Sequence, residues 1–436
     1  DDAMTQENSS NKVSRRHFLK GSTLLGAAAL TSFGESFVHA ASSDELRVGL
    51  LGCGGRGTGA AFNILEADPH AKIVTLGDAF EDQLSNSLRN LKKSFEDRVD
   101  VPADRQFVGL DAYKEVVKNC DVVLLASPPG FRPMQIEAAG EAGGHIFAEK
   151  PFATDAPGLR RALEASKKAK AKNLTLVSGF CYRYEAAKIA TFEQIFNGAI
   201  GDIVALQCTY NAGTLWHRGR QDQWTDLEWQ MRNWLYFAWL SGDHVVEQSC
   251  HSLDKLLWAM GDVAPSRVTA SGGRIQRTDA KYGDIYDHFN SALEWDNGIR
   301  GFHSCRQLGG SDTNVSDFIL GTKGQAAIMA HRISGATDWR FEGENENMYV
   351  SEMRALSRAI RENETINDGQ RACESTLTAL MVRNSAYTGK VVTREQMLNS
   401  QVDLMPKSLE WGPLEVRPVP IPGMPSAYLD PAKGLL

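Results

Sequence analysis

Residues 46–57 read LRVGLLGCGGRG, and this stretch decides the fold. Its apolar first half is typical of a buried strand, and the glycine turn that follows opens onto the helix-forming run 58–65. In the dinucleotide fingerprint G-x-G-x-x-G, the glycines permit a tight turn, close approach of a pyrophosphate and packing of helix on strand. Unpaired N–H groups at the helix start then face the phosphate charge. We expect a dinucleotide to be bound by Gly52, Gly54, Gly55, Arg56 and Gly57; a glycine turn without a ligand is the alternative.

An acidic residue follows where this fingerprint requires one. The strand-like run 72–76 is followed by Asp78, about 20 residues past Gly57. A carboxylate at this place accepts hydrogen bonds from a ribose diol and repels a 2′-phosphate. The sequence therefore predicts NAD as the cofactor, with NADP less favoured.

The composition excludes several classes of protein. The chain has 436 residues, enough for two domains with their own cores, and 42% hydrophobic with 23% charged residues is typical of a globular protein. A net charge of −7 offers no basic surface for a phosphate backbone, so we expect no nucleic-acid partner. The seven cysteines include no C-x-x-C pair, which argues against a zinc knuckle.

Residues 1–40 are predicted to be an export signal. Residues 14–20, SRRHFLK, resemble the twin-arginine signal S-R-R-x-F-L-K, and Val38-His39-Ala40 fits a cleavage site. The apolar stretch 21–30 is too short to span a bilayer, which argues against a membrane anchor. We expect the twin-arginine translocase to export the protein to the periplasm or beyond, without stable membrane insertion.

Residues 41–180 are predicted to form a dinucleotide-binding domain of the Rossmann type. Helix-like segments at 112–117 and 132–142 alternate with strand-like segments at 121–126 and 145–149. This alternation predicts an α/β fold with a doubly wound parallel sheet, whose ligands lie at the carboxyl ends of the strands. Ser127, Glu149 and Lys150 fall at such ends, and we assign Ser127 and Glu149 to the cofactor site.

Residues 181–345 are predicted to form a second, α+β domain. Strand-like runs, several joined by turns, favour a largely antiparallel sheet; they lie at 202–210, 266–275, 287–295, 299–306 and 317–328. Residues 346–436 hold two predicted amphipathic helices, 351–360 and 371–387, which we expect to return to the first domain. The proline-rich tail from Met405 is expected to form an extended strap.

The segment Glu149-Lys150-Pro151 is predicted to carry chemistry. A lysine at the end of the fifth strand can direct its ammonium to a substrate oxygen beside the nicotinamide and stabilise alkoxide character. The proline also allows a cis peptide bond. A surface lysine without a role is the alternative.

Residues 242–258 read as one helix that presents a second catalytic group. Glu247 and His251 are four residues apart, which places them on one helical face within hydrogen-bonding reach. An imidazole paired with a carboxylate suits a general base for a sugar or polyol hydroxyl. Asp254 either orients His251 or caps the network. His244, Glu247 and His251 could also be metal ligands, but no fourth ligand has characteristic spacing, so no metal is expected.

Three motifs in this order, Gly52-x-Gly-x-x-Gly57, Glu149-Lys150-Pro151 and Glu247-x-x-x-His251-x-x-Asp254, resemble the glucose–fructose oxidoreductase, inositol dehydrogenase and MocA (Gfo/Idh/MocA) family over about residues 45–395. The resemblance implies a Rossmann domain joined to a domain with an open-faced sheet, and a homodimer or homotetramer through that face. It also implies that Lys150 and His251 flank the substrate carbon that faces nicotinamide C4. The family usually has aspartate where this chain has Glu247.

Further stretches resemble one branch of that family. Residues 54–59, 181–184 and 228–239 are similar to the branch related to NAD-dependent glycosidases of the α-N-acetylgalactosaminidase type. In that branch a bound NAD oxidises the sugar at C3, the aglycone is eliminated, and the cofactor is reoxidised in place. Such glycosidases commonly lack the lysine that this chain keeps as Lys150. We therefore favour an exported oxidoreductase acting on a sugar, sugar acid or polyol, with a redox-neutral glycosidase or lyase and a noncatalytic sugar-binding protein as alternatives.

Two further expectations concern ligands. We assign Tyr182, Arg183, His217 and Asp254 to substrate binding, since aromatic faces pack on sugar C–H groups while polar groups bond hydroxyls. Trp216 and the tryptophan-rich run 229–239 could belong to the same carbohydrate pocket, with burial in an interdomain core as the alternative. Because the twin-arginine pathway exports folded proteins to a space without a free nicotinamide pool, we expect tightly bound NAD.

Overall fold

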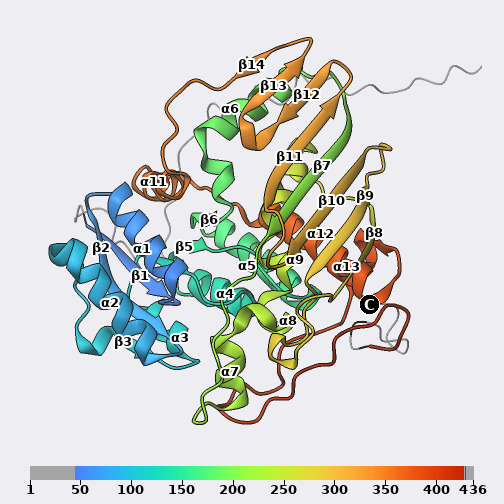
Figure 1. Cartoon of the computed structure of the whole chain (residues 1–436). Helices are drawn as coiled ribbons and strands as arrows, with labels where there is room; N and C mark the ends of the chain where they lie inside the picture. Colours follow the sequence, from blue (N-terminus) through green and yellow to red (C-terminus); the bar gives the residue numbers. More distant parts are fainter. Residues whose placement is uncertain (1–44, 427, 429–436) are drawn as a thin grey trace, which may run out of the picture. The chain divides into compact units, whose positions relative to one another are not determined.

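The computed structural model describes residues 45–426 and 428, so the predicted signal at residues 1–40 lies outside the described part. The first sheet has six parallel strands in the order β3-β2-β1-β4-β5-β6, which confirms the predicted doubly wound fold (Figure 1). Its strands are β1 (Leu46–Leu51), β2 (Ala71–Asp78), β3 (Gln106–Val108), β4 (Val122–Leu125), β5 (His145–Ala148) and β6 (Leu176–Ser178). Its helices are α1 (Gly55–Ala67), α2 (Glu81–Phe95), α3 (Ala112–Val116), α4 (Arg132–Glu141) and α5 (Ala156–Ala171).

The glycine turn after β1 has the conformation that its sequence requires. Gly52 has φ +90°, a region that favours glycine, and a Cβ there would lie 2.5 Å from the Ser127 nitrogen. A Cβ on Gly57 would lie 1.8 Å from the Gly52 carbonyl oxygen. Only glycine fits at these two positions, because the turn packs directly against the end of β4 and the start of α1.

The second sheet is large and mostly antiparallel, as predicted. Its nine strands lie in the order β14-β13-β12-β11-β7-β10-β9-β8-β15, and β7 with β10 is the parallel pair among the pairings described. The strands are β7 (Ile203–Ala212), β8 (Arg267–Gly273), β9 (His288–Glu294), β10 (Arg300–Gln307), β11 (Asn314–Gly321), β12 (Gly324–Ala327), β13 (Arg332–Gly335), β14 (Trp339–Arg340) and β15 (Val392–Thr393). The expected single strand 317–328 is instead the hairpin of β11 and β12, which turns at Thr322 and Lys323.

Helices cover one face of this sheet, while the other face is open. The covering helices include α10 (Cys250–Ala259) and α12 (Gly369–Thr388), and α6 (Ala186–Phe196) lies beside the β12 end (Figure 1). On the opposite face the Phe302 side chain is 52% exposed.

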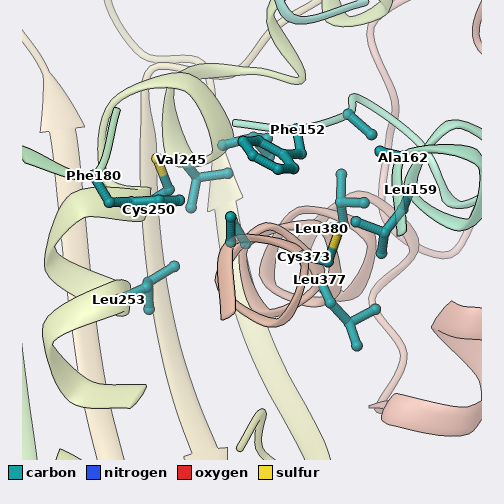
Figure 2. Packing of buried hydrophobic residues seen from close by; sticks show 14 of the residues in the cluster. Phe152, Leu159, Ala162, Phe180, Val245, Cys250, Leu253, Cys373, Leu377 and Leu380 are labelled. Carbon is teal, nitrogen blue, oxygen red and sulfur yellow. The ribbon is translucent and has the colours of Figure 1, made fainter. Parts of the chain in front are cut away.

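The two C-terminal helices differ in a way that the sequence analysis did not anticipate. Helix α11 (Met348–Arg361) packs against α1 through one face, with Met353 and Leu356 buried. Helix α12 is buried on all sides from Ala372 to Thr388, so its predicted amphipathic character is wrong. Figure 2 shows its residues Cys373, Leu377 and Leu380 between side chains of α5 and of α10. A helix that is enclosed on all sides needs no polar face.

The C-terminal tail from Met405 to Ser426 has no helix and follows the surface of other elements. It runs along α7 (Asp226–Arg232), where the Leu227 amide donates to the Gly412 carbonyl at 3.2 Å, and Tyr428 is buried against Tyr387. Over residues 45–426 and 428, no helix combines the length and apolar character that crossing a membrane requires. The domain boundaries at residues 180 and 345 stay a prediction.

Helix α12 also anchors the segment that follows Lys150, which makes one hydroxyl critical. The Thr376 hydroxyl accepts a hydrogen bond from the Phe152 amide at 3.1 Å, in a fully buried place. Thr376→Val keeps the shape but leaves that amide without a partner, and we expect it to lower the free energy of unfolding by about 1–3 kcal/mol.

The matched control is Thr378→Val, because the buried Thr378 hydroxyl donates to the Glu374 carbonyl within its own helix. Urea unfolding of both variants should show the larger loss for Thr376→Val. Equal losses would contradict the importance of this contact.

Candidate active site

A cleft of about 530 Å³ lies at the carboxyl ends of β1, β2 and β4. Most of the predicted cofactor residues line it: Gly52, Gly54, Gly55, Arg56, Gly57, Asp78 and Ser127. Glu149 does not line the cleft, but its carboxylate pairs with the Arg56 guanidinium at 3.1 Å. The structure therefore brings the predicted cofactor residues together.

The start of α1 fits a bound pyrophosphate. No side chain caps this helix, and its N-cap residue is Gly54. A Cβ on Gly54 or Gly55 would meet nothing within 4 Å, so the backbone at the start of α1 is open to the cleft. Unpaired amides with the positive end of the helix dipole bind phosphate oxygens. This cradle has the chemistry that a dinucleotide needs.

Asp78 links the glycine turn to the end of β2. Its two carboxylate oxygens accept hydrogen bonds from the Cys53 amide at 2.6 Å and the Phe80 amide at 2.9 Å. Burial raises the pKa of this carboxyl group, although the two amides act in the opposite direction. Asp78 thus lies in the cleft wall at the position expected for a residue that bonds a ribose diol.

The opposite wall of the cleft comes from residues 216–234, which include α7 and the loop before it. It comprises Trp216, Arg218, Met231, Arg232 and Trp234. The sequence analysis expected a carbohydrate near the tryptophan-rich run, but it assigned no binding role to Arg218 or Arg232. They reach the cleft only because α7 and the loop before it fold back toward β2.

Lys150 follows β5, and its ammonium donates a hydrogen bond to the main-chain carbonyl of Glu247. The Lys150–Pro151 peptide bond is cis. Burial by itself lowers the pKa of Lys150, but the neighbouring Cys250, Glu247 and Glu149 outweigh it and raise the pKa above its ordinary value. The ammonium therefore stays charged at neutral pH. The residue before it, Glu149, pairs with Arg56 in the cleft wall.

Residues 242–258 form two helices rather than the expected one. Helix α9 (His244–Glu247) ends at Gln248, and α10 begins at Cys250. At the break, the Ser249 hydroxyl bonds the His303 ring of β10 at 2.9 Å. The predicted single helix is thus interrupted between Glu247 and His251.

Glu247 and His251 do not form the expected imidazole–carboxylate pair. The Glu247 carboxylate accepts a hydrogen bond from the Gln307 amide at 3.3 Å. The His251 Nδ1 is buried without a hydrogen-bond partner among the described residues. His244 instead pairs with Asp243 at 3.0 Å and contacts the Cys305 sulfur at 3.3 Å. Among the described residues no hydrogen bond joins the Glu247 carboxylate to the His251 imidazole, and the roles of both residues stay a prediction.

The charges of Lys150, Glu247 and His251 depend on one another. Burial raises the pKa of Glu247 to about 7, while Lys150 and Gln307 oppose this shift. Burial lowers the pKa of His251 well below its ordinary value, and the positive charges of Lys150 and Lys255 lower it further. At neutral pH the site thus holds a charged lysine, a neutral imidazole and a carboxyl group that titrates.

Tyr182 lies beside His251, with the two rings edge to face at 5.3 Å. The Lys255 ammonium is 4.1 Å from the centre of the tyrosine ring and forms a buried ion pair with Asp317 at 3.0 Å. Burial raises the pKa of Tyr182 to about 12, so its hydroxyl remains a proton donor. The structure thus brings this predicted substrate residue next to His251.

Three other predicted substrate residues have partners within the protein. Arg183 and Asp254 form a buried ion pair at 2.7 Å, and Asp254 also accepts from the Ser375 hydroxyl at 2.7 Å. Asp254 therefore caps a network with Arg183 rather than orienting His251. His217 contacts the Lys281 carbonyl at 3.1 Å, between Tyr236 and Tyr282, and does not line the cleft.

Comparison with protein families matches three parts of the chain. Residues 46–179 match the oxidoreductase family with an NAD-binding Rossmann fold, and residues 191–327 match the GFO/IDH/MocA C-terminal domain. Residues 12–32 match the twin-arginine translocation signal. The chain therefore carries an NAD-binding domain, the C-terminal domain that accompanies it and a signal for export.

Characterised relatives include two inositol dehydrogenases. The chain is 24% identical over 296 residues to myo-inositol 2-dehydrogenase of Thermotoga maritima, covering 67% of this chain and 77% of that protein. It is 25% identical over 288 residues to the NAD-dependent scyllo-inositol 2-dehydrogenase of Bacillus subtilis, covering 65% of this chain and 74% of the relative.

Solved structures share the fold. Scyllo-inositol dehydrogenase of Lactobacillus casei with bound NAD(H) and scyllo-inositol has a TM-score of 0.63 at 19% identity, covering 81% of this chain and 100% of that one. The aldose-aldose oxidoreductase of Caulobacter crescentus complexed with glycerol also has a TM-score of 0.63, at 18% identity, covering 80% and 99%. At these identities the likeness concerns the fold.

The raised pKa of Glu247 predicts a pH-dependent stability. Because the folded protein holds a proton up to about pH 7 that the unfolded chain releases near its ordinary pKa of about 4.3, ionisation opposes folding as pH rises between these values. Glu247→Gln removes this dependence, so its midpoint of thermal unfolding should rise relative to the wild type from pH 5 to pH 8. The control is Glu141→Gln, at an exposed position. Parallel profiles for the wild type and Glu247→Gln would contradict the assignment.

Proposed function

Because the chain belongs to the Gfo/Idh/MocA family of NAD-binding oxidoreductases, we propose that it transfers a hydride from a hydroxyl carbon of a sugar, sugar acid or polyol to a bound nicotinamide. One observation supports this most directly. The charged Lys150 ammonium and the neutral His251 imidazole belong to one buried cluster, and Glu149 beside Lys150 pairs with Arg56 of the nucleotide cleft. The relatives named for inositol oxidation act on polyols of the same chemical class.

The bound nicotinamide supplies the hydride acceptor. Oxidation of an alcohol also releases the hydroxyl proton, which needs a base in the correct protonation state. The neutral His251 imidazole can accept that proton. The Lys150 ammonium can stabilise the alkoxide that forms as the proton leaves, because a fixed charge in a buried site requires no reorganisation.

Glu247 and Tyr182 complete the proposed site. Glu247 lies where its charge holds the Lys150 pKa high, and Gln307 fixes its carboxyl group through a hydrogen bond. Tyr182 packs on His251 and can donate its hydroxyl proton to a substrate oxygen. Arg183 and Asp254 form a buried ion pair, and we propose that it holds α10, and with it His251, in position.

The export signal bears on how the cofactor is used. A folded protein that leaves the cytoplasm has no pool of free nicotinamide to exchange with, so we propose that NAD is bound tightly and is returned to its starting state in each cycle. A second carbonyl substrate can return it in an oxidoreductase. We further propose a homodimer or homotetramer formed through the open face of the second sheet, around the exposed Phe302.

Mass spectrometry of the cofactor released from denatured, freshly purified protein tests this proposal first. Nicotinamide absorbance should then change on addition of a sugar or polyol and revert on addition of a carbonyl substrate. Net glycoside cleavage without a lasting change of absorbance would establish the redox-neutral glycosidase or lyase instead. Purified protein without nicotinamide would leave a noncatalytic sugar-binding protein.

Substitution of the two proposed catalytic residues should separate chemistry from cofactor binding. Lys150→Met and His251→Asn should each lower kcat by about 10²- to 10⁴-fold, because a preorganised charge or a base is lost. The bound NAD content should stay near that of the wild type. Lys168→Met, at an exposed position of α5, serves as the control. Undiminished turnover in either site variant would refute its role.

A further inference from the structure

Arg232, at the end of α7, makes several contacts across the rim of the nucleotide cleft. Its guanidinium donates to both oxygens of the Asp82 carboxylate, at 3.0 and 3.2 Å, and to Glu228 at 2.8 Å. It also stacks over the Phe80 ring at 4.0 Å. A planar guanidinium with a bidentate carboxylate and an aromatic face is held in one orientation. Arg232 therefore joins α7 to the residues that follow β2.

The C-terminal tail supports this contact from outside. The ring of Trp411 lies 5.7 Å from that of Phe80, and the Gln230 side chain donates to the Leu414 carbonyl at 2.9 Å. The Leu414 amide in turn donates to the Asp226 carboxylate at 3.2 Å. The tail, red in Figure 1, thus fastens α7 along its length.

We propose that Arg232, Asp82, Phe80 and Trp411 form a clasp that holds the dinucleotide in its cleft and sets the rate at which it leaves. This inference rests on the proposed use of a bound nicotinamide. The clasp closes beside Asp78, because Phe80 donates its amide to the Asp78 carboxylate and both Phe80 and Arg232 line the cleft. The glycine turn and Asp78 lie on one wall of the cleft, so closure from the opposite wall depends on Arg232.

The two polar side chains of the clasp, Arg232 and Asp82, stay charged. The hydrogen bond from Arg232 lowers the pKa of Asp82, so this carboxylate remains ionised at neutral pH. Asp82 is about half exposed while Arg232 is mostly covered, so salt reaches the contact and weakens it. A cofactor retained in this way is released faster at high ionic strength, and the rate of release rather than of binding changes.

Release of NADH from the full-length protein measures the clasp directly. The protein is loaded with NADH, excess NAD is added, and the loss of bound-nicotinamide fluorescence is followed. Arg232→Ala and Asp82→Asn each weaken the contact between the two side chains, and each should speed the release of NADH about tenfold or more. Release from the wild type should accelerate with added salt, and this acceleration should shrink in both variants.

The matched control is Arg220→Ala, which removes an exposed ion pair with Asp226 on the same helix without touching Phe80 or Asp82. It should release NADH at the wild-type rate. Unchanged release in both Arg232→Ala and Asp82→Asn, with NADH still bound by the wild type, would overturn the clasp alone. A wild-type protein that binds no nicotinamide would overturn the proposed function as well.

Discussion

The rest of the structure depends on the burial of α12 between the helices of the first sheet and those of the second. Its polar side chains are used for bonds that join distant segments. Arg383 donates to the Thr154 carbonyl and to the Gly242 carbonyl, while Thr376 accepts from the amide of Phe152. Such bonds are costly to leave unmade in a buried place, so the segments after Lys150 and before α9 have fixed positions. That is why the Lys150 ammonium meets the Glu247 carbonyl.

Within this frame, the chemistry of the site follows from a few charges that share a buried space. Lys150 keeps its proton because Cys250, Glu247 and Glu149 together outweigh the effect of burial, and its charge in turn helps to keep His251 neutral. Asp254, a residue that could have stabilised a charged His251, is committed to Arg183. The site thus holds one charged lysine and one neutral imidazole, the division of charge on which the proposed alcohol oxidation relies.

The nucleotide cleft unites two different kinds of binding surface. On one side is the backbone of Gly54 and Gly55 at the start of α1, which suits a pyrophosphate because these residues have no side chain to block its approach. On the other side are aromatic and guanidinium groups from α7 and the loop before it. The first surface is typical of the fold, whereas the second is supported by the proline-rich tail. The export signal gives the proposed retention of the cofactor its physical rationale, since a lost dinucleotide would not be replaced outside the cytoplasm.

The sequence by itself determined the features that depend on neighbouring residues. The glycines at 52 and 57 follow from backbone space, and Asp78 and Lys150 follow from the ends of parallel strands, so the cleft and its cofactor were predictable. Only the tertiary structure decided the break at Gln248, the enclosure of α12, the pairing of Asp254 with Arg183 and the reach of Arg232 to Asp82. These last two contacts join residues 71 and 150 positions apart. No local pattern encodes them, because such partners are chosen by the packing of the whole core and not by the spacing along one helix or strand.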